Sequence, residues 1–267
     1  MSISSKFSRM RTPLWLTAGV LGLAACGDDI TNVNSSIPTF TPNPIVAQAA
    51  LQTALATAVS STNGGLDFPM WATVVDRAGV VVAVVHSGTA VGNQWLGSRA
   101  ISAQKANTAN DFSLDVFALS TANLFSAVQP GGSLFGLQES NPVSTDVVYG
   151  GNQADYGSST DFMIGKKPGG VNVFGGGLAL YNSAGQVIGA VGVSGDTSCA
   201  DHNIAWRLRD ALGLDFVRAG VDAGTDDILY DITLNGSGHM VSASGFGHPT
   251  CGGSENSFDM SVLYPIS

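Results

Sequence analysis

The sequence contains few histidines, few cysteines and few basic residues, and these shortages exclude several classes of protein. It holds 4 His, 3 Cys and 11 Lys+Arg against 20 Asp+Glu in 267 residues, a formal net charge of −9. Nucleic acid is therefore not an expected partner, because phosphate binding depends on clustered cations. The chain also lacks a Gly-x-x-x-x-Gly-Lys-[Ser/Thr] phosphate loop and a Gly-x-Ser-x-Gly hydrolase elbow. Ser194, in Gly-Val-Ser-Gly, is interpreted as a turn residue.

No apolar run reaches the roughly 20 residues that a membrane-spanning helix needs. The run Leu14–Leu23 is too short and is followed by Ala-Ala-Cys26. Three cations precede it: Lys6, Arg9 and Arg11. This order of segments is typical of a bacterial lipoprotein signal peptide. We expect residues 1–25 to be removed and Cys26 to carry acyl chains that hold the protein on a membrane.

The remaining chain is acidic and long enough for one domain. Without the leader, eight basic residues stand against 20 acidic ones, a formal net charge of −12. Gly27 follows Cys26 where an inner-membrane retention signal would have Asp, which favours the outer membrane of the cell envelope. We predict a polar tether over 26–44, an α/β domain over 45–220 and an extension packed on that domain over 221–267.

Two stretches, 72–88 and 178–195, each predict a β-hairpin. β-branched runs flank a turn in both. The turns hold matching residues, Asp76 with Gly79 and Asn182 with Gly185. The acid or amide can bond to the turn backbone and the glycine can adopt a positive φ. One sheet with helices packed on it is the simplest architecture.

Helical spacing of apolar residues predicts four helices, at 45–62, 97–112, 116–125 and about 201–212. The second carries alanine at every third position, so it is thin enough to lie close to a sheet. Asp201 is the expected N-cap of the fourth. Glycine and proline pairs predict long surface loops between the second helix and the second hairpin.

The extension alternates apolar and polar residues in two short runs between Ile228 and Ile266, which predicts added strands or a cover. Asp226 and Asp227 precede these runs in a polar stretch. We expect both carboxylates to be solvated.

The motifs together resemble a known family. They are Val74-Val75-Asp76-x-x-Gly79, Ala103-Gln-Lys105-Ala-Asn-Thr108-Ala, Pro168-Gly-Gly170 and Ile188-Gly-Ala-Val-Gly-Val-Ser-Gly195 followed by Asp201. In this order and spacing they are similar to the haem-degrading or haem-binding family of HbpS-like and GlcG-like proteins. The resemblance runs from about Ile45 to Leu214.

The resemblance implies an α/β (α+β) fold, with an antiparallel sheet of about five strands flanked by helices in a profilin-like two-layer or three-layer sandwich. It also implies homo-oligomers and binding of haem or a related tetrapyrrole. The chain departs from the family at His86-Ser-Gly-Thr-Ala90, where similar proteins carry an arginine. The segment between Leu137 and Lys167 is also longer than the family pattern.

Haem binding needs an apolar slot, an axial ligand and partners for two propionates. His86 is the leading candidate for the axial ligand, Arg99 and Lys105 for the propionates, and Thr108 for the pocket wall. Each residue also has a structural alternative: an exposed strand-end histidine, a cation lying over the sheet edge, or a threonine bonded to its own helix.

Cys199-Ala-Asp-His202 and His248-Pro-Thr-Cys251 form a mirrored pair of motifs. The four side chains could hold zinc as a Cys2His2 site. With Cys26 lipidated, only two thiols remain in an oxidising compartment, which favours a Cys199–Cys251 disulfide over zinc.

These observations favour a lipid-anchored, extracytoplasmic protein that binds haem or a related tetrapyrrole for capture, storage or sensing. One alternative is an enzyme, either a haem degrader or an accessory oxidoreductase. A second is a structural or partner-binding lipoprotein that has kept the fold without the ligand, an alternative that the scarcity of histidine supports.

Overall fold

The computed structural model describes residues 37–267, which form one compact unit. The predicted leader and Cys26 lie outside the described residues. At its centre is a four-stranded antiparallel sheet in the order β2-β1-β4-β3. Its strands are β1 (Trp71–Asp76), β2 (Val81–His86), β3 (Gly177–Tyr181) and β4 (Val187–Ser194). The sheet thus joins the two predicted hairpins through β1 and β4, and it has four strands where about five were expected.

The two hairpin turns are built alike, as the sequence predicted. Asp76 Oδ1 accepts the backbone N–H of Ala78 and Val80, at 2.9 and 3.0 Å. Asn182 Oδ1 likewise accepts the N–H of Ala184 and Gln186, each at 3.0 Å. The following glycines have positive φ, 76° at Gly79 and 67° at Gly185. The repeat in sequence is therefore a repeat of turn chemistry.

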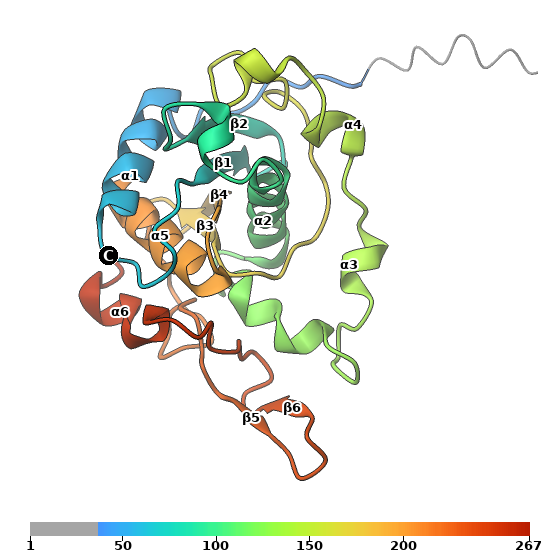
Figure 1. Ribbon diagram of the computed structural model, residues 1–267, viewed down its shortest axis with the longest axis vertical. Coiled ribbons are helices and arrows are strands. Elements are labelled where there is room, and N and C mark those ends of the chain that lie inside the picture. Colours follow the sequence, from blue (N-terminus) through green and yellow to red (C-terminus); the bar gives the residue numbers. More distant parts are fainter. Residues whose placement is uncertain (1–36) are drawn as a thin grey trace, which may run out of the picture. The chain divides into compact units, whose positions relative to one another are not determined.

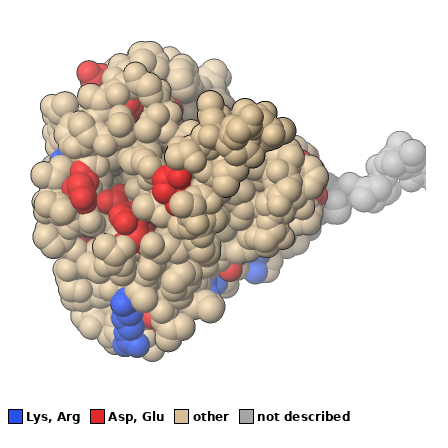
Figure 2. Space-filling view, turned by 90° about the horizontal axis from the view of Figure 1, so that it is seen from below, with Lys and Arg blue, Asp and Glu red and all other residues tan. Residues whose placement is uncertain are grey.

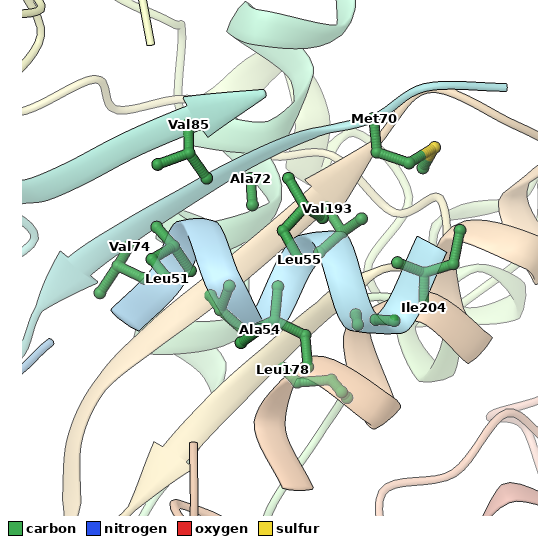
Figure 3. Close-up of a cluster of buried hydrophobic side chains, with 14 of the residues drawn as sticks. Leu51, Ala54, Leu55, Met70, Ala72, Val74, Val85, Leu178, Val193 and Ile204 are labelled. Atoms are coloured by element: carbon green, nitrogen blue, oxygen red, sulfur yellow. The ribbon is translucent and has the colours of Figure 1, made fainter. Parts of the chain in front are cut away.

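Helices cover both faces of the sheet, so the domain has three layers (Figure 1). Helices α1 (Gln48–Ser60) and α5 (Ser198–Ala211) pack on one face, and α2 (Ser98–Phe112) packs on the other. Figure 3 shows Leu51 and Leu55 of α1 among side chains from the strands. On the α2 face the contact is close, because four alanines, Ala100, Ala103, Ala106 and Ala109, meet the sheet.

Between α2 and β3 the chain is mostly loop, as predicted, but the expected helix over 116–125 is wrong. Two 3-10 turns, Ala122–Leu124 and Ser126–Val128, take its place. Two short helices follow, α3 (Leu137–Ser140) and α4 (Thr145–Val148). The apolar residues near 116 had no long helical run to join, since Leu114 and Phe117 form an isolated bridge.

The C-terminal extension packs against α5 and carries its own two-stranded hairpin, β5 (Ile232–Leu234) with β6 (Met240–Ser242), which does not join the main sheet. It ends in helix α6 (Met260–Leu263). The prediction that Asp226 and Asp227 are solvated is wrong, because both are buried. Asp226 pairs with Arg209, and Asp227 bonds to His202.

The last part of the expected tether lies on the domain. Phe40 N–H donates to the Gly165 carbonyl oxygen, and Asn43 N–H donates to Asp76 Oδ2 at 2.9 Å. Within residues 37–267, no helix is both long and apolar enough to cross a bilayer. Figure 2 shows one face of the molecule, with acidic side chains scattered over its middle and most of its area uncharged.

Candidate functional site

A cavity of about 270 Å³ opens beside the C-terminal end of β4, between α2 and the start of α5. Its lining comprises Trp95, Ser98, Ile101, Phe174, Ser194, Asp196, Ser198 and Asp201. The outer residues are apolar, with Trp95 52% and Phe174 47% exposed. The inner ones are polar and buried, including Ser98, Ser194 and Asp201. Small-molecule sites combine apolar side chains with polar groups that orient the ligand, and this cavity has both kinds.

Asp201 organises the floor of this cavity. Its Oδ1 accepts the backbone N–H of Gly195 and Asp196, at 3.2 and 2.8 Å, which fixes the turn between β4 and α5. The predicted role as N-cap of α5 is wrong. Thr197 caps that helix through its Oγ1, which accepts Ala200 N–H at 3.2 Å. Asp201 instead bonds back across the turn from the first turn of the helix.

Lys105 lies beneath the cavity and is fully buried. Its Nζ donates to Asp201 Oδ2 at 2.6 Å and to the Val193 carbonyl oxygen at 3.0 Å. Burial raises the pKa of Asp201 to about 6, although the Lys105 ammonium opposes the shift. Burial also lowers the pKa of Lys105. Burial thus disfavours the charged forms of both partners, and the short contact between them offsets this penalty.

Arg99 forms hydrogen bonds with the loops that pack outside α2. It donates to Asp161 from Nε at 3.0 Å and from Nη2 at 2.5 Å, and to the Val148 carbonyl oxygen at 2.6 Å. Its guanidinium carbon lies 3.7 Å from the ring centroid of Tyr156. These contacts hold the long segment before β3 against the helix. Because carboxylates already pair with Arg99 and Lys105, neither cation is free to meet a propionate while these pairs hold.

Thr108 connects α2 to the loop that follows Gly170. Its Oγ1 donates to the Gln104 carbonyl oxygen at 2.7 Å and accepts Asn172 N–H at 3.0 Å. The hydroxyl is therefore used twice within the fold.

His86 ends strand β2 on the α2 side of the sheet. Its ring packs edge-on against Trp71, with centroids 5.0 Å apart. Nδ1 donates to the Gly88 carbonyl oxygen at 2.9 Å, so Nε2 carries the lone pair. Trp71 is paired with His86 on one side and with Ser194 on the other. Only Ser194 belongs to the cavity lining, so Trp71 separates His86 from the cavity.

The four predicted binding residues therefore do not meet in one pocket. Lys105 reaches the cavity through Asp201, and the other three do not belong to its lining. The sequence reasoning missed the aromatic rim, because the order of residues does not bring Trp95 to Phe174. The tryptophan between polar and glycine residues in the stretch 92–98 was the available signal, and it is exposed in the structure.

The Cys199–Cys251 disulfide predicted from the sequence is present in the structure. Cys199, His248 and Cys251 lie close enough for a metal, with ligand atoms within 4.8 Å of one another, but both sulfurs are used in the bond. His202, the fourth member of the alternative zinc set, instead bonds through Nε2 to Asp227 at 3.1 Å. The Cys2His2 arrangement is thus not formed in this structure.

Three of the solved structures that are similar to this chain each have a low overall superposition on it. The crystal structure of Klebsiella pneumoniae protein ORFY is 28% identical, covers 62% of this chain and 90% of its own, and has a TM-score of 0.42. The crystal structure of a PduOC:heme complex is 24% identical, covers 61% of this chain and 89% of its own, and has a TM-score of 0.43. The crystal structure of a double mutant of Streptomyces reticuli HbpS is 14% identical, covers 75% of this chain and 97% of its own, and has a TM-score of 0.40.

No curated protein matches this chain. The family model described as "Haem degrading protein HbpS-like" matches residues 45–208, which is more than half of the sequence. That span contains all four strands of the main sheet, the helices α1 and α2, most of α5 and the whole cavity lining. The chain therefore belongs to the HbpS-like haem-degrading protein family.

Proposed function

We propose that the protein binds haem or a related tetrapyrrole, with an apolar edge of the macrocycle inserted in the cavity against Trp95, Ile101 and Phe174. The exposed aromatic rim of the cavity is the observation that carries this proposal. The ring of Phe68 continues it, with its centroid 5.3 Å from that of Trp95. A flat apolar ligand would cover surface that these side chains now expose to water.

The charges around the cavity support one orientation of the ligand. Asp196 and Asp201 line the cavity, and Lys105 and Arg99 are paired with carboxylates. Propionates would be repelled at the floor and are therefore expected to point toward solvent. The porphyrin edge then enters the cavity first.

His86 is our proposed iron ligand, because the neutral ring with its hydrogen on Nδ1 has a lone pair on Nε2 and because the residue is partly exposed. Among the other histidines, His202 and His248 are buried and bonded, and His239 lies on the distant β5–β6 hairpin. Reaching His86 from the cavity means passing Trp71, so ring insertion and iron ligation need separate tests.

The test is titration of the purified protein with haemin, followed by the Soret band. We expect a shifted band near one equivalent. Since each rim contact is worth roughly 1.5 kcal/mol or more, Trp95→Ala and Phe174→Ala should each raise the Kd about tenfold, and the double variant should raise it about 100-fold. Phe135→Ala is the matched control, because Phe135 is 67% exposed but lies outside the cavity lining. No shift in the parent would remove the proposal.

His86→Ala separates ligation from insertion. If His86 ligates iron, this variant changes the band position and intensity whatever happens to affinity. An unchanged spectrum with the rim variants impaired would keep the cavity and remove His86.

Degradation of the ligand is a second candidate, which the family description and the titratable Asp201 beside the cavity favour. Loss of the Soret band on addition of reductant and oxygen, slowed by Asp201→Asn, would support it. A stable band under these conditions would leave binding alone.

We further propose that the protein is a lipoprotein of the cell envelope, anchored through Cys26 and facing the periplasm or the cell surface from the outer membrane. Mass spectrometry of the mature N-terminus should find acyl chains on Cys26, and Cys26→Ser should release the protein from membranes. We also propose that it forms homo-oligomers, which light scattering of the purified protein tests.

A further inference from the structure

The cavity wall contains a serine hydroxyl hydrogen-bonded to a histidine. Ser198 is the first residue of α5, lines the cavity and is partly exposed there. Its Oγ lies 2.8 Å from Nε2 of His248, which comes from the C-terminal extension. His248 is outside the span that the family model matches, so this pair is an addition to the family domain.

The hydrogen bonds of His248 fix where its proton lies. Nδ1 is 2.7 Å from the Pro249 carbonyl oxygen, which can only accept, so Nδ1 carries the hydrogen. Nε2 therefore has the lone pair, and Ser198 Oγ–H donates to it. Burial lowers the pKa of His248 to about 4, although the hydrogen bond to the Pro249 carbonyl oxygen opposes the shift. The ring is thus neutral at pH 7 and able to accept a proton.

Ser198 Oγ keeps one lone pair free. A hydroxyl oxygen has two lone pairs, and one accepts Gly175 N–H at 2.6 Å. The Ser198 backbone N–H, at the N-terminus of the 14-residue helix α5, has no hydrogen-bond acceptor among residues 37–267. That N–H and the positive end of the helix dipole are next to Ser198 Oγ, and they could stabilise negative charge on a carbonyl oxygen bound there.

We propose that Ser198 is a nucleophile and His248 its general base, and that the pair transfers acyl groups from esters with a flat apolar part that fits the aromatic rim. Ser198 Oγ bonds to the ester carbonyl carbon while its proton passes to His248 Nε2. The carbon–oxygen bond to the leaving alcohol then breaks, and the imidazolium returns the proton to that alcohol. Water, activated by the same nitrogen, hydrolyses the acyl-serine and restores the pair.

The surroundings of His248 limit the rate. A carbonyl oxygen, not a carboxylate, lies behind Nδ1, so the imidazolium is stabilised less than in a Ser-His-Asp triad, and burial disfavours it further. We therefore expect the pair to react with activated electrophiles, and the acylated serine to persist long enough to be detected.

The experiment uses the purified full-length protein with a fluorophosphonate and, separately, p-nitrophenyl acetate, and maps the adduct by mass spectrometry. We expect one equivalent at Ser198, no adduct in Ser198→Ala, and labelling slowed at least about 100-fold in His248→Gln. Ser126→Ala is the matched control. Its hydroxyl donates to the neighbouring Gly247 carbonyl oxygen without touching the imidazole, so labelling should keep the parent rate.

An absent adduct at Ser198, or equal rates in the parent and His248→Gln, would overturn the proposal. Should His248→Gln fail to fold, the test is whether the parent protein is labelled at Ser198 alone or at several serines. An adduct at Ser198 alone that disappears in urea supports the pair, and adducts spread over several serines remove it. None of these outcomes depends on haemin, so the inference and the proposed tetrapyrrole binding fail separately.

Discussion

Arg209 and Asp226 form a bidentate ion pair, with Nη1 and Nη2 each 2.8 Å from a carboxylate oxygen. Solvent reaches only 1% of one side chain and 0% of the other. The pair joins helix α5 to the start of the C-terminal extension. The guanidinium also lies over the ring of Trp206, 4.6 Å from its centroid. The extension is thus attached to the family domain through a buried charge pair as well as through the disulfide.

Asp226→Asn should destabilise the protein strongly. The substitution keeps the size of the side chain but leaves the Arg209 charge buried without its partner, which costs about 3–5 kcal/mol. Urea unfolding measures the difference. Asp67→Asn is the control, since Asp67 is exposed, and it should change the free energy of unfolding by less than about 0.5 kcal/mol. Similar values for the two variants would contradict the role of the pair.

The stability of the protein should contain a pH-dependent contribution from His248. Its pKa is about 4 in the folded state, against an ordinary histidine value of 6.5, so protons bind preferentially to the unfolded chain between these values. The contribution is fully present above pH 6.5 and is lost as the pH falls toward 4, up to about 3 kcal/mol. The free energy of unfolding is compared between the parent and His248→Gln over this range.

The comparison with His248→Gln is needed because Asp201 changes the free energy of unfolding with pH in the opposite direction. Its pKa, raised by burial to about 6, favours the folded state below the unfolded value of 3.8, and this advantage is lost as the pH rises to 6. Asp201 is present in both proteins and cancels. Parallel pH profiles for the parent and His248→Gln would show that His248 titrates normally.

Removing the disulfide should cost roughly 4 kcal/mol in the chain-entropy model. The bond links residues 52 positions apart. Cys199→Ala with Cys251→Ala should lower the urea midpoint, and a reducing agent should lower that of the parent but leave the double variant unchanged. A parent insensitive to reduction would indicate that the bridge adds little beyond the surrounding contacts.

Gly192→Ala should separate α2 from the sheet. A Cβ at Gly192 would lie 2.0 Å from the Ser102 carbonyl oxygen and 2.5 Å from the Ala106 nitrogen, both backbone atoms that cannot move aside alone. We expect a loss of about 3 kcal/mol or more, the upper part of the range for overpacking. Gly97→Ala, where nothing lies within 4 Å, is the control and should be nearly neutral. Equal stability would show that the helix shifts at little cost.

Local chemistry made the hairpins and the thin helix predictable. Asp76 and Asn182 bond to backbone within four residues, so the sequence window contains the whole turn. The alanine spacing of α2 likewise predicts the close approach of this helix to the sheet at Gly192. The cap of α5 was missed for the opposite reason. Asp201 forms an ion pair with Lys105, 96 residues away, and the sequence next to Asp201 does not reveal that contact.

The candidate site was harder to predict because its residues meet through the sheet order and not through sequence proximity. Arg99 and Lys105, the candidate partners for the propionates, are both buried. Their carboxylate partners were not foreseen. Asp226 and Asp227 show the same difficulty, because consecutive acids normally indicate solvation, and here each has its own buried partner on α5.

The attachment of residues 37–44 to the domain has a consequence for reach. If Cys26 carries the lipid as proposed, only the chain from there to residue 36 is left to bridge the gap, and at its longest it spans roughly 40 Å. The domain would then stay in a thin layer next to the bilayer. A ligand released at that surface would meet it sooner than one diffusing deep in the compartment.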